Sequence, residues 1–129
     1  MSINFLAVLV AAASSFALGG LWYSPALFLK PWNKAMGRSD KDNGHPARVF
    51  GLSFVFALVA AFVFAMLLGP SPALSEAWKA GLLVGVGFVA MSLGINYQFA
   101  NRPIVAWLID GGYHTTQFVL YGLILGAWH

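Results

Sequence analysis

Four long apolar stretches run through the sequence, and short segments rich in polar residues or proline separate them. They lie at about residues 3–23, 49–69, 77–100 and 103–127, and each has about the 20 residues that an α-helix needs to cross a bilayer. Only helices or closed barrels satisfy the backbone inside lipid. The pattern therefore predicts an all-α, polytopic membrane protein: residues 1–129 form one domain, a four-helix transmembrane bundle.

The first stretch is predicted to be a membrane span and not a secretory signal peptide. No basic residue precedes it, and it is longer than the apolar region of a signal peptide. It ends in Trp22 and Tyr23, residue types that gather where membrane meets water.

Residues 24–48 are predicted to form a basic cytoplasmic loop that begins with a short interfacial segment. The part from Ser24 to Lys34 mixes bulky apolar residues with lysines and prolines, which is typical of a broken element in the lipid headgroup layer. Trp32 would anchor this element. The segment either recognises anionic lipid or is a plain cytoplasmic loop, and the plain loop is the simpler interpretation.

The basic residues predict the orientation of the spans. One group stands in or beside residues 24–48, Arg102 lies between the third and fourth stretches, and only Lys79 flanks the segment between the second and third. The first group is Lys30, Lys34, Arg38, Lys41 and Arg48. Because lysine and arginine stay on the cytoplasmic side, both basic loops are expected inside and both termini outside. The net charge of +3 is thus an orientation signal and not a sign of nucleic-acid binding.

The composition narrows the function classes further. Hydrophobic residues make up 60% of the chain and charged residues only 9%, against roughly 25% charged in a soluble domain. The chain has no cysteine, which excludes disulfides, thiolate metal sites and thiol catalysis. No hydrolase elbow, phosphate-binding loop, dinucleotide fingerprint or H-E-x-x-H motif occurs. We therefore expect neither an enzyme nor a protein with a cofactor.

The candidate site is a stripe of polar residues in the last apolar stretch. Asp110, His114, Gln117 and Tyr121 follow one another at spacings of 4, 3 and 4, which places them on one face of a helix. Asn96, near the end of the third stretch, is a further candidate. An ionisable residue at this depth costs at least about 2.5 kcal/mol unless other groups shelter it.

Two interpretations of Asp110 stay open. Either the stripe binds or transports a proton, a cation or a small polar ligand, or Asp110 is a structural clasp. As a clasp it would be held by Arg102, Arg48 or a lysine near the cytoplasmic face. In the first case Asp110 and His114, at i and i+4, would meet and titrate as a coupled pair.

A metal or haem site is not expected. Bis-histidine haem would need a second histidine within the membrane, and His45 and His129 both fall outside the apolar stretches. One aspartate and one histidine are also fewer ligands than zinc requires.

Glycines in the last two stretches predict close helix packing. Gly81 and Gly85, and again Gly122 and Gly126, have the G-x-x-x-G spacing that lets helices approach. Small residues and thin spans predict a homo-oligomer surrounded by membrane lipid. A larger membrane complex, in which the chain is a non-catalytic accessory or scaffold subunit, is the alternative to a transport module.

Two blocks of sequence carry a resemblance to a known family. The first is Gly20 to Pro25, including Trp22, Tyr23 and Ser24, followed by Lys30-Pro31-Trp32. The second is Gly112-Tyr113-His114 with the terminal Gly126-Ala127-Trp128. The chain resembles the small bacterial membrane proteins of domain of unknown function family 1761. The resemblance implies four spans in a bacterial inner membrane, a structural role for the block from Trp22 to Trp32, and no assigned activity.

A weak internal repeat is also present. The segment Leu18–Tyr23 before Pro25 is similar to the segment Leu93–Tyr97 before Pro103. This similarity predicts that the first and second pairs of spans are parallel halves of the protein.

Overall fold

The computed structural model describes residues 3–39 and 44–129, and within them all regular structure is helical. Lys41 and the loop aspartates Asp40 and Asp42 lie outside the described residues. The elements are, in order, α1 (Phe5–Trp22), α2 (Leu29–Met36), α3 (Pro46–Leu68), α4 (Leu74–Leu82), the π-helix η1 (Leu83–Ala90), α5 (Met91–Phe99) and α6 (Ile104–Ala127).

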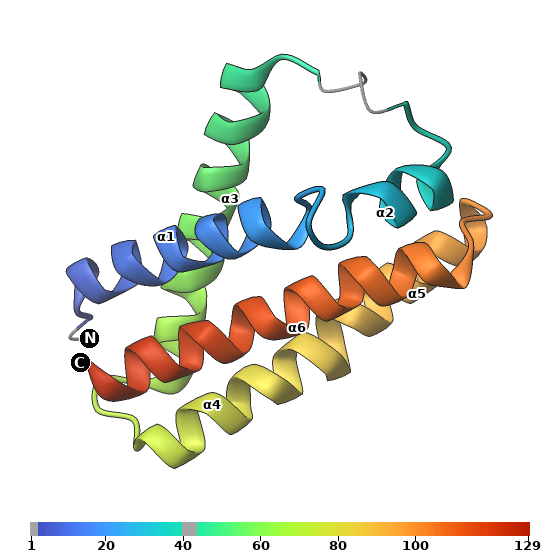
Figure 1. The fold of residues 1–129 in the computed structure, drawn as a ribbon. Helices are drawn as coiled ribbons and strands as arrows, with labels where there is room; N and C mark the ends of the chain where they lie inside the picture. The colour runs from blue at the N-terminus through green and yellow to red at the C-terminus, as the bar shows by residue number, and fades with distance from the viewer. Residues whose placement is uncertain (1–2, 40–43) are drawn as a thin grey trace.

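Helix α6 is the centre of the fold. It lies between α1 on one side and the continuous rod of α4, η1 and α5 on the other, and runs antiparallel to both (Figure 1). Helix α2 continues beyond the end of α1 and also packs on α6. More side chains are buried on α6 than on any other element, including Asp110, Gln117 and Tyr121. The polar stripe therefore faces the interior of the molecule.

Three helices are long and apolar enough to cross a membrane: Phe5–Trp22, Pro46–Leu68 and Leu74–Phe99. Helix α6 has the required length, but the polar side chains from Asp110 to Gln117 lower its hydropathy. The structure thus supports a helical protein with three span-capable helices.

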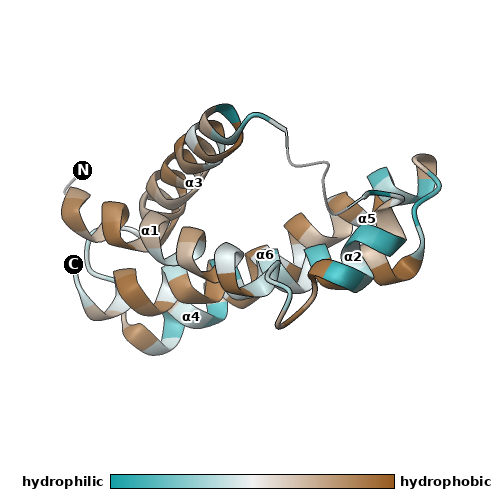
Figure 2. Ribbon diagram, turned by 45° about the horizontal axis from the view of Figure 1, so that its top comes forward, coloured by the Kyte–Doolittle hydropathy of each residue, from teal (hydrophilic) through white to brown (hydrophobic). Residues whose placement is uncertain are grey.

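The structure does not confirm the expected four-helix bundle, because α3 diverges from the other helices. It crosses α1 at a steep angle and touches α6 only weakly (Figures 1 and 2). At the crossing, alanines from both helices are buried and let the backbones approach: Ala7 and Ala11 from α1, Ala57 and Ala61 from α3. Further along, the ring of Phe16 meets those of Phe50 and Phe54 at 5.9 and 5.7 Å between centroids. These bulky rings hold the two helices apart.

Both G-x-x-x-G motifs lie in the contact between the α4–η1 rod and α6, each against the partner helix. A Cβ added to Gly81 would lie 2.2 Å from the carbonyl oxygen of Phe118, and one added to Gly122 would lie 2.3 Å from that of Ala77. A Cβ on Gly85 would lie 2.6 Å from the Cα of Thr115. Only glycine fits such backbone-to-backbone contact. The partner that the sequence left unnamed is within the chain itself.

The π-helix η1 was not anticipated from the sequence. A π segment shifts the backbone hydrogen bonds from the α pattern, which changes how carbonyl groups are satisfied. The carbonyl of Ala90, at its end, accepts a 2.7 Å hydrogen bond from Nε1 of Trp107 on α6. Gly94 and Gly111 lie under the same indole. Trp107 therefore joins α6 to the junction of η1 and α5.

We expect Trp107→Phe to lower stability by about 0.5–1.5 kcal/mol, because it removes this hydrogen bond while keeping an aromatic ring. Thermal unfolding in detergent would measure the loss. Trp78→Phe is the matched control, since Trp78 is more exposed and its ring faces Lys79. Equal effects of the two substitutions would show that the bond to Ala90 does not contribute.

The structure also gives the residues at which the helices begin. Asn4 caps α1, with its Oδ1 accepting from the N–H of Ala7 at 3.1 Å. Helix α4 begins at Leu74 and has Ala73 as its N-cap residue. Pro103 is the residue just before α6 and not its first helical residue. The segment 24–48 is also not simply a loop, since it contains α2 and the first turn of α3.

Candidate functional site

Asp110 lies at the point where four elements meet. It is only 6% exposed. Its Oδ1 accepts a hydrogen bond from the hydroxyl of Tyr23, at the end of α1, and its Oδ2 accepts one from the hydroxyl of Tyr97 on α5. Oδ2 also accepts from the indole Nε1 of Trp32 on α2, at 3.2 Å. We call Tyr23, Trp32 and Tyr97 the Asp110 cage.

The cage differs from the expected clasp in one chemical respect: all three donors are neutral. Among residues 3–39 and 44–129, no lysine, arginine or histidine pairs with the carboxylate. Neither Arg102 nor Arg48 holds Asp110, and Lys41 lies outside the described residues. Arg102 instead donates from Nη1 to the carbonyl of Met36 at 2.8 Å, tying the α5–α6 turn to the end of α2. Arg38 lies over the Trp32 ring, 4.8 Å from its centroid.

The sequence block around Ser24 and Pro25 explains how two cage residues reach Asp110. After α1 the chain turns sharply: the Ser24 hydroxyl donates to the carbonyl of Leu21 at 2.7 Å, and the N–H of Phe28 donates to the carbonyl of Trp22 at 3.1 Å. After this turn α2 continues past the end of α1 and packs on α6. The block from Trp22 to Trp32 is therefore part of the site and not a passive linker.

Aromatic contacts hold the block in place. Nε1 of Trp22 donates to the carbonyl of Ile109 at 2.9 Å, one residue before Asp110. The ring of Tyr23 packs edge-on against that of Trp32, with 5.2 Å between centroids. Trp32 was expected as an anchor in the headgroup layer, but its indole N–H is directed to the carboxylate. Together these contacts fix the orientation of both donors.

A second polar cluster follows further along α6. Nδ1 of His114 lies 2.6 Å from Oε1 of Gln117, and Nε2 of Gln117 donates to the Tyr121 hydroxyl at 2.9 Å. The Tyr121 oxygen is 3.0 Å from Oγ of Ser15 on α1 and 3.3 Å from the carbonyl of Ala57 on α3. This cluster joins α6 to α1 and α3 by hydrogen bonds.

The expected pairing of Asp110 with His114 is absent from this arrangement, because the two side chains bind different partners. Asn96 is exposed on α5 and does not join the site. Its neighbour Tyr97 is the residue that reaches Asp110. One sequence signal pointed to it: the weak repeat aligns Tyr23 with Tyr97, and these are the two hydroxyl donors of the cage.

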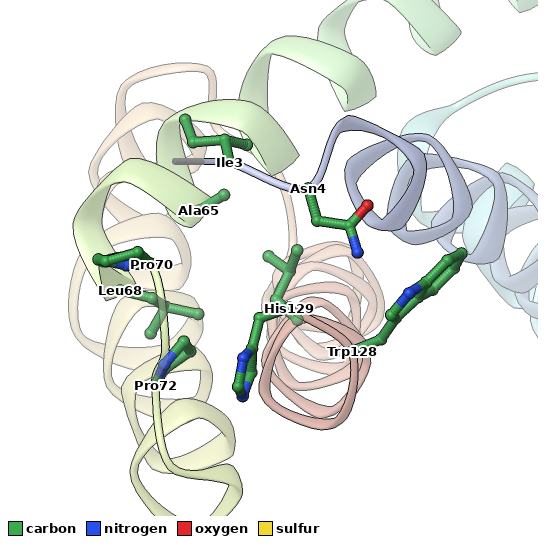
Figure 3. Close-up of a pocket in the computed structure, with 10 residues that line it drawn as sticks. Ile3, Asn4, Ala65, Leu68, Pro70, Pro72, Trp128 and His129 are labelled. Atoms are coloured by element: carbon green, nitrogen blue, oxygen red, sulfur yellow. The ribbon is translucent and has the colours of Figure 1, made fainter. Parts of the chain in front are cut away.

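Two hollows lie away from both clusters. One, of about 20 Å³, lies between the start of α1, the α3–α4 turn and the end of α6 (Figure 3). It has room for about one water molecule. The other is an open, mainly apolar groove of about 350 Å³ between α5 and α6, lined by Met91, Gly94, Ile95, Gln98, Ile104 and Trp107. Neither is lined by Asp110 or His114.

Comparison with known proteins gives one match. Residues 6–126 match the family described as protein of unknown function, DUF1761. The chain belongs to this family. No curated protein and no solved structure matched it. The part matched to DUF1761 contains Asp110, all three cage residues and the second polar cluster.

Membership of DUF1761 confirms the resemblance seen in the sequence but brings no activity with it. The chemistry of the DUF1761 site must therefore come from its own geometry. That geometry offers a buried carboxylate whose two oxygens are held by three neutral donors, and a separate chain of polar side chains ending at a histidine.

Proposed function

We propose that this DUF1761 protein is a non-enzymatic integral membrane protein whose Asp110 binds a proton or a small cation. One observation carries the proposal: a carboxyl group that is 6% exposed has three hydrogen-bond donors but no counter-charge among the described residues. Burying a charge without a partner of opposite sign costs several kcal/mol. A proton or a bound cation relieves that cost.

The cage suits both charge states of Asp110. While the group is ionised, Tyr23, Trp32 and Tyr97 all donate to it and stabilise the charge. If it gains a proton, its O–H needs an acceptor. A tyrosine hydroxyl can turn from donor to acceptor, whereas an indole N–H can only donate. The two tyrosines thus supply the adaptable positions, and Trp32 supplies a fixed one.

The arrangement of helices supports a membrane position for this site. We propose that α6 crosses the membrane beside the three span-capable helices, sheltered by α1 and the α4–η1–α5 rod. The start of α1 and the end of α6 lie at one end of the molecule (Figure 1). At the other end lie α2 and the α5–α6 turn, which Arg102 ties together. This supports termini outside, with the basic segments in the cytoplasm of a bacterial cell.

Asp110→Asn tests the proposal, because it keeps the shape of the side chain and removes its charge and its ability to titrate. In detergent micelles, we expect the melting temperature of the unaltered protein to depend on pH or on the concentration of Na⁺ or Li⁺. The substitution should abolish the part of that dependence that comes from Asp110. The control is Gln98→Glu, which adds an exposed acid on α5 near the same end.

The proposal fails if the unaltered protein and Asp110→Asn show the same dependence on pH and on both cations. Infrared difference spectra give an independent measure. A protonated carboxyl band that appears on acidification and disappears in Asp110→Asn would assign proton uptake to this residue. A dependence on cations without that band would assign cation binding.

A second candidate function is that of an accessory subunit in a larger membrane complex. The observation favouring it is the first half of α3, which packs on little else in the chain and exposes large apolar side chains: Val49, Phe50, Leu52, Val55 and Phe56. The glycines that motivated the expected homo-oligomer are occupied within the chain. An oligomer or a complex would therefore use this half of α3. A stoichiometric protein partner after mild solubilisation would support it.

A further inference from the structure

The hydrogen bonds of the second polar cluster all run in one direction. Its far ends are the backbone carbonyls of Ala12 and Ala57, which can only accept. The Tyr121 hydroxyl donates to Ala57, and the Ser15 hydroxyl has both Ala12 and the Tyr121 oxygen as acceptors. The Tyr121 oxygen therefore accepts from Nε2 of Gln117.

This direction determines the protonation of His114. With its amide nitrogen turned to Tyr121, Gln117 presents its Oε1 to His114, and Oε1 can only accept. Nδ1 of His114, 2.6 Å away, must then carry a proton. In the neutral imidazole, Nε2 is consequently the unprotonated nitrogen with a free lone pair. Among the described residues, no donor is bonded to it.

From this geometry we propose that His114 is a second proton-binding site, which accepts its proton at Nε2. Binding forms one N–H bond and converts imidazole to imidazolium, while the bond from Nδ1–H to Gln117 is kept. No member of the cluster has to turn around. The positive charge makes the bond to Gln117 charge-assisted, and it polarises the chain that continues to Tyr121 and Ser15.

Protonation of His114 is thus coupled to the contact between three helices. Through Tyr121 the cluster ties α6 to Ser15 of α1 and to Ala57 of α3. Its strengthening should hold α3 more firmly in its crossing position. The inference does not rest on the proposed role of Asp110, since the two groups have separate partners.

The surroundings of His114 contain few other charges. On α6 itself, Asp110 precedes it by one turn, and the Tyr113 ring packs edge-on against the imidazole at 4.9 Å between centroids. From the end of α1, the ring of Tyr23 meets Tyr113. The segments Phe5–Trp22 and Leu83–Ala90 carry no titratable side chain, and α3 carries only Arg48, in its exposed first turn. Asp110 is the one acidic residue of α6, and α4, which also packs on α6, carries Glu76 and Lys79, both exposed.

The test is nuclear magnetic resonance of the full chain in detergent micelles or nanodiscs, with ¹⁵N-labelled histidine. Long-range ¹H–¹⁵N correlations distinguish which ring nitrogen carries the proton. His45→Gln and His129→Gln assign the remaining signals. At alkaline pH we expect His114 to show a proton on Nδ1, the opposite of the form that free histidine favours. On acidification, Nε2 should gain a proton while the Nδ1 signal persists.

Two variants at Gln117 test whether its side chain is the reason that Nδ1 of His114 carries a proton. Gln117→Glu keeps an acceptor for Nδ1–H, and the Nδ1-protonated form should persist; Gln117→Leu removes the acceptor, and His114 should revert towards the ordinary form. A proton on Nε2 and none on Nδ1 in the unaltered protein would overturn the inference. So would a His114 that gains no second proton down to about pH 5, below the usual histidine range. Asp110→Asn should leave the Nδ1 preference intact, which separates this result from the test of Asp110.

Discussion

Gly81→Ala and Gly122→Ala are expected to destabilise the protein by about 3 kcal/mol or more each, the upper range for overpacked sites. At both positions the new methyl group would lie less than 2.5 Å from a backbone carbonyl oxygen of the neighbouring helix. A backbone group cannot move aside as a side chain can, so α4 and α6 would have to separate. Thermal or chemical unfolding in detergent would record the loss.

Gly87→Ala is the matched control. Gly87 lies in η1, on the same rod as Gly81, and nothing lies within 4 Å of a Cβ placed there. Since alanine favours a helix over glycine by about 1 kcal/mol, this substitution should be neutral or stabilising. If Gly81→Ala melted at the same temperature as Gly87→Ala, the close approach of α4 and α6 would be refuted.

Asp110→Leu is the second substitution with a large expected effect, a loss of about 3 kcal/mol. It removes the acceptor from Tyr23, Trp32 and Tyr97 at once, and each buried donor left unsatisfied costs about 1–3 kcal/mol. The three donors are only partly buried, so the expected loss is smaller than the sum of three full penalties. Unfolding in detergent measures it.

The triple variant Asp110→Leu, Tyr23→Phe, Tyr97→Phe provides the control. Removing both partners of a hydrogen bond is often nearly neutral, so the triple variant should regain part of the stability lost by Asp110→Leu alone. A triple variant no more stable than the single one would mean that unsatisfied tyrosine hydroxyls do not cause the loss. That result would contradict the cage as described.

The sequence predicted the interior side of α6 well, because helical periodicity depends only on residues near one another in the chain. Asp110, Gln117 and Tyr121 are buried as their spacing indicated. The partners of Asp110 could not be predicted in the same way. Tyr23 and Trp32 precede it by 87 and 78 residues, and which donors arrive there depends on the turn after α1.

Other differences between the predicted and the observed fold arise from helix packing, which the local sequence pattern does not indicate. Helix α3 diverges because alanines lie at its crossing point with α1 and phenylalanine rings lie beyond that point. The hydropathy of α3 would be the same whether it diverged or lay in a bundle with the other helices. The π-helix η1 likewise has an ordinary apolar sequence. By contrast, the weak repeat between Leu18–Tyr23 and Leu93–Tyr97 contained information about the site, since it aligned the two tyrosines that bind Asp110.

The central position of α6 has a consequence for the order in which the protein is synthesised and folds. Of all the helices described here it leaves the ribosome last, yet α1, α2 and the α4–η1–α5 rod all pack on it. The earlier helices are therefore made before the helix on which they pack. When α6 is made, the three residues that donate to its aspartate have already been synthesised. A chain that ended before Asp110 would lack the acceptor that joins the end of α1, α2 and α5.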